Sequence, residues 1–272
     1  MGDAIPVVVT GAAGRMGRML INAVVDDPGL SLHGAVEMSG HPEAGKDAGL
    51  AAGLGELGVK ITDDFSKAIS GAGGVIDFTA PGPTMDHLEE CAEKGVPMVI
   101  GTTGLDEAQK ARAAELSAGL PIVLAPNMSQ GVNLLFFLVE QAARILGDGF
   151  DIEIVEAHHN KKKDAPSGTA LRLGEVAAAG RGWSFNDTLR ACREGMIGER
   201  PAKEIGIQTL RAGDIVGEHT VMFGGMGERI ELTHRAHSRD TFARGAARAV
   251  HWLAGKGPGL YDMQDVLGLK GD

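Results

Sequence analysis

Residues 5–17, which read IPVVVTGAAGRMG, decide the fold. The apolar run 5–10 predicts a buried β-strand, and the amphipathic segment 15–25 predicts the helix that follows it. Three glycines, Gly11, Gly14 and Gly17, lie at the junction. Glycine permits a tight turn, a close approach of backbone N–H groups to a pyrophosphate, and close packing of helix on strand. The stretch therefore predicts the first strand, turn and helix of a dinucleotide-binding domain.

The alternation of strand and helix continues to about residue 127. Strand-like segments lie at 31–37, 59–62, 75–79, 97–103 and 122–126, and helical patterns at 84–94 and 106–117 separate the later ones. Strands that are apolar on both faces and alternate with helices are typical of a parallel sheet covered on each side. The first half therefore predicts a doubly wound, Rossmann-type α/β domain.

The second half predicts an α+β domain. An apolar helix is expected at residues 132–146, an alternating strand at 151–159 and a helix from about Pro166. Three strand-like segments then follow without helices between them, at 205–211, 215–223 and 229–236. Because short turns join these segments, we expect antiparallel pairing. The final helix, 241–253, is expected to pack back on the first domain.

Charge and composition limit the possible partners. The formal net charge is −10 and the pI is about 5.4, and such a surface repels phosphate backbones and anionic lipid headgroups, so we expect no nucleic acid and no membrane as partner. The longest apolar run, 134–139, is too short to cross a bilayer, and residues 1–10 do not resemble a secretory signal. Cys91 and Cys192 form no CxxC pair, which favours a reducing cytoplasm.

Glu37 closes the second expected strand, 20 residues after Gly17. An acid at this place accepts hydrogen bonds from the adenosine ribose and repels the 2′-phosphate of NADP. Met38 follows it where a phosphate-binding arginine could stand, so we expect a preference for NADH over NADPH, although Arg15 or Lys46 could still bind the phosphate. The glycine spacing is GxxGxxG rather than GxGxxG, and a ligand-free turn is the alternative interpretation.

Two further loops follow parallel strands, at the sheet edge where such folds bind ligands. They are GTTG at 101–104 and APNMS at 125–129. Their small and hydroxyl residues suit contact with the nicotinamide ribose and carboxamide. Ordinary turns explain each tetrapeptide about as well.

The densest group of reactive side chains lies at 156–169, EAHHNKKKDAPSGT. On an extended strand His158 and His159 point to opposite faces, whereas Glu156 shares the face of His158 and could orient it. Three lysines follow, and SGT at 167–169 places N–H and hydroxyl donors at a helix start. Together these groups predict a site for a carboxylate or phosphate. The lysine run alone would be explained by a solvated surface.

No metal site is expected. His158 and His159 are adjacent rather than four residues apart on a helix, and the chain has no HExxH motif or Cys/His cluster. Cys91 shares a helical pattern with Leu88, which indicates a core position rather than a nucleophile.

With these motifs the chain resembles the 4-hydroxy-tetrahydrodipicolinate reductase (dihydrodipicolinate reductase) family over nearly its whole length. The resemblance rests on VTGAAGRMG at 9–17, GTTG at 101–104, EAHH at 156–159 and DAPSGTA at 164–170, of which the last two together are specific. It implies a cytoplasmic homotetramer that uses NADH or NADPH. The substrate it implies is a small cyclic imine dicarboxylate, formed when the hydroxy compound loses water in the diaminopimelate route to lysine.

The resemblance also implies a domain organisation. Residues 1–128 and 240–272 would form the dinucleotide-binding domain, and residues 129–239 would form the domain for substrate binding and oligomerisation.

The same resemblance assigns residues to roles. His158 and Lys162 match the catalytic pair, and which of them delivers the proton stays open. His159, Gly168 and Thr169 match contacts to the substrate carboxylates. The residues that match cofactor contacts are Gly11, Ala12, Ala13, Gly14, Arg15, Met16, Gly17, Glu37, Gly101, Thr102, Thr103, Ala125, Pro126, Asn127 and Met128. The chain departs from the family pattern at Met38, Pro126 and Met128, and the first departure puts NADPH use in doubt.

Two other functions compete with this one. The first is another aspartate-family dehydrogenase, such as a homoserine or semialdehyde dehydrogenase. A semialdehyde dehydrogenase needs an activated cysteine, and neither Cys91 nor Cys192 lies in such a setting. A redox-sensing NAD-binding module would need the glycine turn but not the cluster of His158, Lys162 and Thr169.

Overall fold

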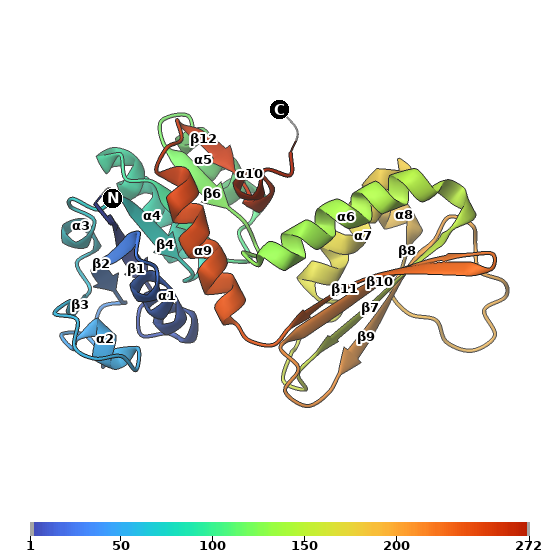
Figure 1. Ribbon diagram of the computed structural model, residues 1–272, viewed down its shortest axis with the longest axis horizontal. Coiled ribbons are helices and arrows are strands. Elements are labelled where there is room, and N and C mark those ends of the chain that lie inside the picture. Colours follow the sequence, from blue (N-terminus) through green and yellow to red (C-terminus); the bar gives the residue numbers. More distant parts are fainter. Residues whose placement is uncertain (1–2, 271–272) are drawn as a thin grey trace. The chain divides into compact units, whose positions relative to one another are not determined.

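The computed structural model describes residues 3–270, so the expected domain limits at residues 1 and 272 lie outside the described residues. The chain folds into two compact units (Figure 1). Unit 1 comprises Met1–Gln130 and Arg239–Asp272, and unit 2 comprises Gly131–Ser238. The chain therefore crosses between the units twice.

Unit 1 contains, among the described residues, a seven-stranded sheet whose neighbouring strands are all parallel. The strands are β1 (Ile5–Thr10), β2 (Leu30–Val36), β3 (Ile61–Thr62), β4 (Gly74–Asp77), β5 (Met98–Ile100), β6 (Pro121–Leu124) and β12 (Gly259–Tyr261). Their order is β12-β6-β5-β4-β1-β2-β3. The order reverses direction between β1 and β4, and in doubly wound sheets the crevice at such a point binds ligands.

Helices cover both faces of this sheet, which confirms the predicted Rossmann-type fold. They are α1 (Arg15–Asp26), α2 (Ala48–Ala51), α3 (Phe65–Ala68), α4 (Pro81–Lys94), α5 (Glu107–Leu116), α9 (Asp240–Leu253) and α10 (Met263–Leu267). Figure 1 shows α1 and α9 side by side against the sheet. Val7 and Val9 of β1 pack into the core with α1 and α9, whereas Val8 packs into the opposite core. A strand buried on both faces explains its uninterrupted apolar sequence.

Three strands of unit 1 end two or three residues earlier than the sequence pattern predicted. Segments 75–79, 97–103 and 122–126 end as strands at Asp77, Ile100 and Leu124. The residues beyond these ends leave the sheet and form loops at its carboxyl edge. The small and hydroxyl side chains of 101–103 are therefore available to line a cavity.

Unit 2 contains, within the described chain, a five-stranded mixed sheet of order β11-β10-β7-β9-β8. The strands are β7 (Asp151–His158), β8 (Leu189–Arg190), β9 (Ile205–Arg211), β10 (Gly217–Gly225) and β11 (Glu228–Ala236). Its helices are α6 (Gln130–Leu146), the 3₁₀ turn η1 (Gly147–Gly149), α7 (Gly168–Arg181) and α8 (Phe185–Thr188). Helices α6 and α7 pack on one face, where their apolar side chains meet Ile152, Ile154 and Phe223.

The expected antiparallel pairing of 205–211 with 215–223 is wrong. Strand β7 lies between β9 and β10, parallel to the former and antiparallel to the latter. The other expected pair, β10 and β11, does form an antiparallel hairpin. The connection 212–216 crosses the end of β7, where the backbone N–H of Ala212 donates to the carbonyl of His158 (2.9 Å). Five extended residues can span two strand spacings of about 4.8 Å each, so a short connection does not by itself require a hairpin.

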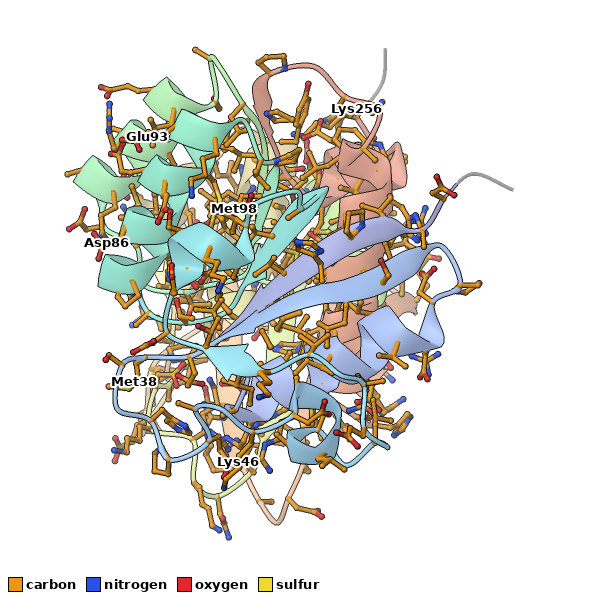
Figure 2. The ribbon with its side chains drawn as sticks, turned by 90° about the vertical axis from the view of Figure 1, so that its left-hand side faces the viewer. Met38, Lys46, Asp86, Glu93, Met98 and Lys256 are labelled. Atoms are coloured by element: carbon orange, nitrogen blue, oxygen red, sulfur yellow. The ribbon has the colours of Figure 1, made fainter. Side chains whose placement is uncertain are left out.

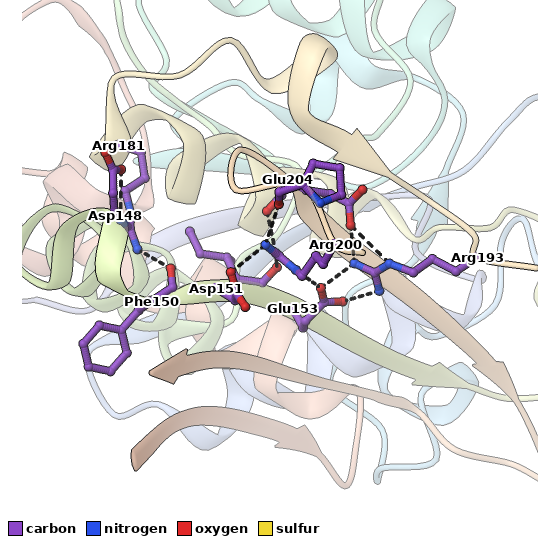
Figure 3. Close-up of polar contacts among 10 residues, drawn as sticks. Asp148, Phe150, Asp151, Glu153, Arg181, Arg193, Arg200 and Glu204 are labelled. Atoms are coloured by element: carbon purple, nitrogen blue, oxygen red, sulfur yellow. Dashed lines mark hydrogen bonds and ion pairs between the residues drawn. The ribbon is translucent and has the colours of Figure 1, made fainter. Parts of the chain in front are cut away.

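An ion-pair cluster anchors the irregular segment between β8 and β9 to the sheet (Figure 3). Arg193 donates to Glu153 (2.8 Å), and Arg200 donates to Glu153 (3.0 Å) and to Asp151 (2.7 Å). Glu204, just before β9, accepts from Arg193 (2.5 Å). The segment is thus held against β7 by partly buried charges rather than by an apolar core.

Within residues 3–270, the structure contains no helix that combines the length and the apolar character needed to span a bilayer.

Gly245 of α9 provides a test of the packing in unit 1. A Cβ at this position would lie 1.8 Å from the carbonyl oxygen of Met128. Alanine ordinarily stabilises a helix relative to glycine, but here the clash with backbone dominates, so Gly245→Ala is expected to lower the free energy of unfolding by about 1–3 kcal/mol. Urea denaturation measures the difference.

Gly82 of α4 is the matched control, because its Cβ would meet no described atom within 4 Å. Gly82→Ala is expected to leave stability unchanged or raised. Equal losses in the two variants would contradict the packing argument.

Candidate active site

The glycine turn after β1 has the geometry that its sequence predicts. Gly11 adopts a φ of +62°, a left-handed conformation that favours glycine. A Cβ at Gly17 would lie 2.0 Å from the carbonyl oxygen of Gly11, so α1 packs directly on the turn. Gly14 is the N-cap of α1 and has no side chain to cap the helix. The first N–H groups of α1 can therefore donate hydrogen bonds to an anion.

The carboxylate of Glu37 lies against this turn. It accepts hydrogen bonds from the backbone N–H groups of Ala13 (3.1 Å) and Met38 (3.0 Å). The Met38 side chain is 70% exposed, and the ammonium of Lys46 is ion-paired with Glu43 (3.0 Å). Figure 2 shows Met38 and Lys46 on the segment that follows β2. The Glu37 carboxylate thus contacts the turn directly, and the ammonium of Lys46 already has a carboxylate partner.

A cavity of about 310 Å³ lies in unit 1 at the carboxyl edge of the sheet. Its lining consists of Met16, Phe78, Thr79, Gly101, Thr102, Thr103, Pro126, Asn127, Met128, Arg239 and Phe242. The cavity therefore brings together Met16 of α1 and the two loops that the sequence singled out. Ala125, also expected there, is buried and does not line it.

No sequence motif pointed to Phe78, Thr79 and Phe242 of this lining, or to the carboxylate behind it. Asp77, the last residue of β4, is 0% exposed and accepts hydrogen bonds from the hydroxyls of Thr79 (2.8 Å) and Thr102 (2.9 Å). A charged residue at the end of an otherwise apolar strand was the available signal.

In unit 2 the corresponding centre is the carboxylate of Glu156, which is 0% exposed. One oxygen accepts from the backbone N–H of Ser167 (3.0 Å), from the Thr209 hydroxyl (3.1 Å) and from Arg211 (2.9 Å). The other accepts from Nδ1 of His158 (2.6 Å) and from Arg211 (2.8 Å). Burial alone would raise the pKa of Glu156, but these donors outweigh it and lower that pKa, so the group is ionised.

This contact determines the tautomer of His158. An ionised carboxylate can only accept, so Nδ1 of His158 carries the hydrogen and Nε2 of the neutral ring is an acceptor. A Cβ at Gly217 would lie 3.1 Å from Nε2, so glycine leaves room beside that atom. Burial lowers the pKa of His158, and the charges of Lys162 and Arg211 lower it further, against the opposing effect of Glu156. At neutral pH the ring of His158 is therefore neutral, and its Nε2 can accept a hydrogen bond.

Lys162 differs from the lysines on either side of it. Its side chain is 21% exposed and ion-paired with Asp164 (2.9 Å), whereas Lys161 and Lys163 are exposed. Its charge acts on His158, whose pKa it lowers. The structure thus brings the ammonium of Lys162 and the imidazole of His158 within electrostatic reach of each other.

The expected carboxylate-binding residues lie around the start of α7. The helix begins at Gly168 rather than near Pro166, because the Ser167 hydroxyl caps it by accepting from the N–H of Ala170 (3.2 Å). Gly168 and Thr169 occupy the first two helical positions, whose N–H groups point out of the helix end. Nδ1 of His159 is buried and has no hydrogen-bond partner among residues 3–270.

His219 of β10 is a buried group that the sequence analysis missed. It is 4% exposed, its ring meets that of His158 edge-on (centroids 5.2 Å apart), and its Nε2 lies 3.1 Å from the hydroxyl of Ser167. Burial lowers the pKa of His219 to about 3. Thr209, Glu156 and His219 are direct partners across β9, β7 and β10, a row that only the correct strand order reveals.

The cysteines agree with the sequence interpretation. Cys91 is fully buried, and burial raises the pKa of its thiol to about 12, so it is a core residue. Cys192 is exposed.

In the part of the chain that the structure describes, no group of three His, Cys, Asp or Glu side chains is arranged to hold a metal ion.

Comparison with known proteins follows the two-unit division. Residues 5–128 match the family model of the dihydrodipicolinate reductase N-terminus, and residues 131–267 match that of its C-terminus. A 4-hydroxy-tetrahydrodipicolinate reductase of Anaeromyxobacter dehalogenans is 60% identical over 97% of this chain and 98% of its own length. One of Geotalea daltonii is 56% identical over 98% of this chain and 100% of its own length.

Solved structures agree in fold. A dipicolinate-bound dihydrodipicolinate reductase from Paenisporosarcina sp. TG-14 has a TM-score of 0.77 at 23% identity, over 96% of this chain and 98% of that one. An amine dehydrogenase from Mycobacterium smegmatis has a TM-score of 0.60 at 16% identity, over 94% of each chain. At these identities the similarity concerns the fold alone.

The depressed pKa of His219 predicts a pH dependence of stability. Its imidazole stays neutral in the folded protein down to about pH 3, whereas the unfolded chain binds a proton below about pH 6.5. Above pH 6.5 the imidazole is neutral in both the folded and the unfolded state and costs no stability. As the pH falls from 6.5 toward 3, only the unfolded chain binds the proton, so the free energy of unfolding decreases. Between pH 7.5 and 5 the wild type is expected to lose about 2 kcal/mol more stability than His219→Gln.

Urea unfolding at a series of pH values measures this difference. Above pH 7 the two proteins should differ by a constant amount. Parallel curves down to pH 5 would show that His219 is not held neutral by the fold.

Proposed function

This chain belongs to the dihydrodipicolinate reductase family, and we propose how its own residues carry out that family's reaction. The reaction is the reduction of 4-hydroxy-tetrahydrodipicolinate, after loss of water, to tetrahydrodipicolinate with a nicotinamide cofactor, in the diaminopimelate route to lysine. The observation that carries the residue assignment is the buried, ionised Glu156, which orients His158 beside Lys162 and the start of α7.

The residues of unit 1 fit a dinucleotide. The glycine turn, where a Cβ at Gly17 would strike backbone, and the N-terminus of α1 would hold the pyrophosphate. Glu37 would accept hydrogen bonds from the adenosine ribose, and the 310 Å³ cavity would hold the nicotinamide end. When bound, the cofactor supplies the hydride.

The residues of unit 2 would bind and protonate a dicarboxylate. His159 and the N–H groups of Gly168 and Thr169 would bind a carboxylate at the start of α7, as helix N-termini do. Addition of a hydride to the conjugated ring leaves an electron pair that must take a proton. We assign the ammonium of Lys162 as the leading donor, because His158 is neutral with Nε2 as an acceptor. The Lys162 charge also stabilises the charge that develops on the ring.

We further propose a preference for NADH. The Glu37 carboxylate would face the 2′-phosphate of NADPH, and the nearest loop lysine, Lys46, is paired with Glu43. Met38 offers no positive charge.

We also propose that the protein is a cytoplasmic homotetramer, as the family resemblance implies. The sheet face of unit 2 that carries Val155, Leu210 and Met222 lies opposite the face on which α6 and α7 pack. Leu210 is 54% exposed on that face, which supports an association surface there.

A coupled assay tests the proposed function. The substrate is made from pyruvate and aspartate semialdehyde by the upstream synthase, and the loss of NADH and of NADPH is followed separately. Oxidation of the cofactor that depends on the complete coupling mixture supports the reductase. A chain that binds NADH without such oxidation would be a sensing module, and the proposal would be wrong.

Replacement of Lys162 tests the proton donor. Lys162→Met is expected to lower kcat by about 10²- to 10⁴-fold, the range for loss of a positioned acid, with little change in NADH affinity. Lys163→Met is the matched control, because that lysine is exposed, and it should stay within about twofold of wild type. Near-normal turnover of Lys162→Met would remove Lys162 from the catalytic pair.

Replacement of Met38 tests cofactor preference. Met38→Arg places a guanidinium beside the position expected for the 2′-phosphate, and the ratio of kcat/KM for NADPH to that for NADH should rise about tenfold or more. Met226→Arg, at an exposed turn of unit 2, controls for added surface charge. An unchanged ratio in Met38→Arg would locate the discrimination elsewhere.

A further inference from the structure

Two threonines in the wall of the unit 1 cavity share one buried partner. Thr79 follows β4 and Thr102 follows β5, and both line the cavity. The hydroxyls of both donate to the same carboxylate oxygen of Asp77, at 2.8 and 2.9 Å, and the N–H of Thr79 donates to it at 3.0 Å. The N–H of Thr79 also donates to the hydroxyl of Thr102 (3.0 Å). Asp77 therefore joins two loops that belong to different strands.

The rest of the Asp77 environment lies behind the cavity wall. The hydroxyl of Thr84 donates to the same oxygen (2.8 Å), and Nδ1 of His87 contacts the other oxygen at 2.6 Å. Both residues belong to α4, and neither lines the cavity. Residues of α4 thus hold the Asp77 carboxylate on one side. On the other side the carboxylate contacts Thr79 and Thr102, which line the cavity.

Phe78, between Asp77 and Thr79, packs closely against the loop that follows β5. A Cβ at Gly101 would lie 2.1 Å from the ring of Phe78, so this ring packs on the backbone of the loop that carries Thr102. Phe78 itself lines the cavity. The order Asp-Phe-Thr therefore builds one wall of the cavity and ties it to the neighbouring loop.

The carboxylate is also charged. Its burial would raise its pKa, but the hydrogen bond and the charge of His87, followed by the hydrogen bonds of the threonines, hold the pKa of Asp77 at about 2. The side chains of Thr79 and Thr102 lie between this buried charge and the cavity, so the charge acts on the cavity through protein rather than through water. At an effective dielectric constant of about 20, its attraction for a cation in the cavity changes binding by about tenfold or more.

The nicotinamide ring is neutral when reduced and carries a positive charge when oxidised. We propose that Asp77 is a positioning residue of the cofactor pocket, which holds Thr79 and Thr102 in place and whose charge favours the oxidised over the reduced ring. The inference rests on the proposed function, because it requires a nicotinamide in this cavity. Stabilising the oxidised ring favours departure of the hydride toward the substrate.

The test measures binding rather than turnover. The dissociation constants of NAD⁺ and NADH are determined by calorimetry and by the fluorescence of bound NADH. Asp77→Asn removes the charge and keeps a side-chain oxygen that can accept from the threonines. The ratio of the NAD⁺ constant to the NADH constant is expected to rise about tenfold relative to wild type. An unchanged ratio in a folded Asp77→Asn protein would overturn the proposal.

Thr84→Val is the matched control for loss of a contact to Asp77. Thr84 does not line the cavity, although its hydroxyl also contacts those of Thr102 (2.8 Å) and Thr79 (3.2 Å). Thr84→Val removes these contacts and one donor to Asp77 but keeps the charge, so the ratio should remain within about twofold of wild type. A shift in Thr84→Val as large as that in Asp77→Asn would show that packing, not charge, determines the ratio, and would also overturn the proposal.

Variants of Thr102 test the positioning role even if the Asp77→Asn protein does not fold. Thr102→Val should raise both dissociation constants about fivefold or more with their ratio unchanged, and Thr102→Ser, which restores the hydroxyl, should bind as wild type. Wild-type binding by Thr102→Val would overturn the positioning role. If the wild type bound none of the dinucleotides, the proposed function itself would fail, a result distinct from all of these.

Discussion

The proposed substrate site of unit 2 depends on the hydrogen bonds and the ion pair made by the buried carboxylate of Glu156. A charge removed from water is costly unless hydrogen bonds and an opposite charge compensate it. Here the compensation comes from Thr209 and Arg211 of β9, His158 of β7 itself and the N–H of Ser167 at the start of α7. The groups that compensate the charge are thereby held in one arrangement. The imidazole tautomer and the helix start are consequences of satisfying one carboxylate.

Unit 1 also contains a buried carboxylate that is satisfied by several hydrogen-bond donors. Asp77 is also fully buried near the carboxyl end of a strand, and its partners come from two loops and a helix. In each unit a buried acid orients hydrogen-bond donors, and some of those donors lie at the place where a ligand is proposed to bind. Orientation is thus completed during folding, so it need not be established when the ligand arrives.

The charge distribution fits a small anionic substrate. The chain carries a net charge of −10, so its long-range field repels anions. Attraction must therefore be local, and Lys162 of the lysine run 161–163, together with the N-terminus of α7, supplies it within a few residues. Of that run only Lys162 is partly buried, and low solvent exposure strengthens the interaction of a charge with its neighbours. The same arrangement would not suit an extended polyanion, which meets the whole surface.

By itself the sequence determined the features that depend on local periodicity. The two-faced apolar strands predicted the parallel sheet, the glycine spacing predicted the turn at Gly11, and the two-residue strand period placed Glu156 and His158 on one face. Only the tertiary structure decided that β7 lies between β9 and β10, and hence that His219 stands beside Glu156. It alone also joined Asp77 to Thr102. Such pairings depend on strand order and on loops distant along the chain, and no local pattern of residues encodes which distant partner will satisfy a buried charge.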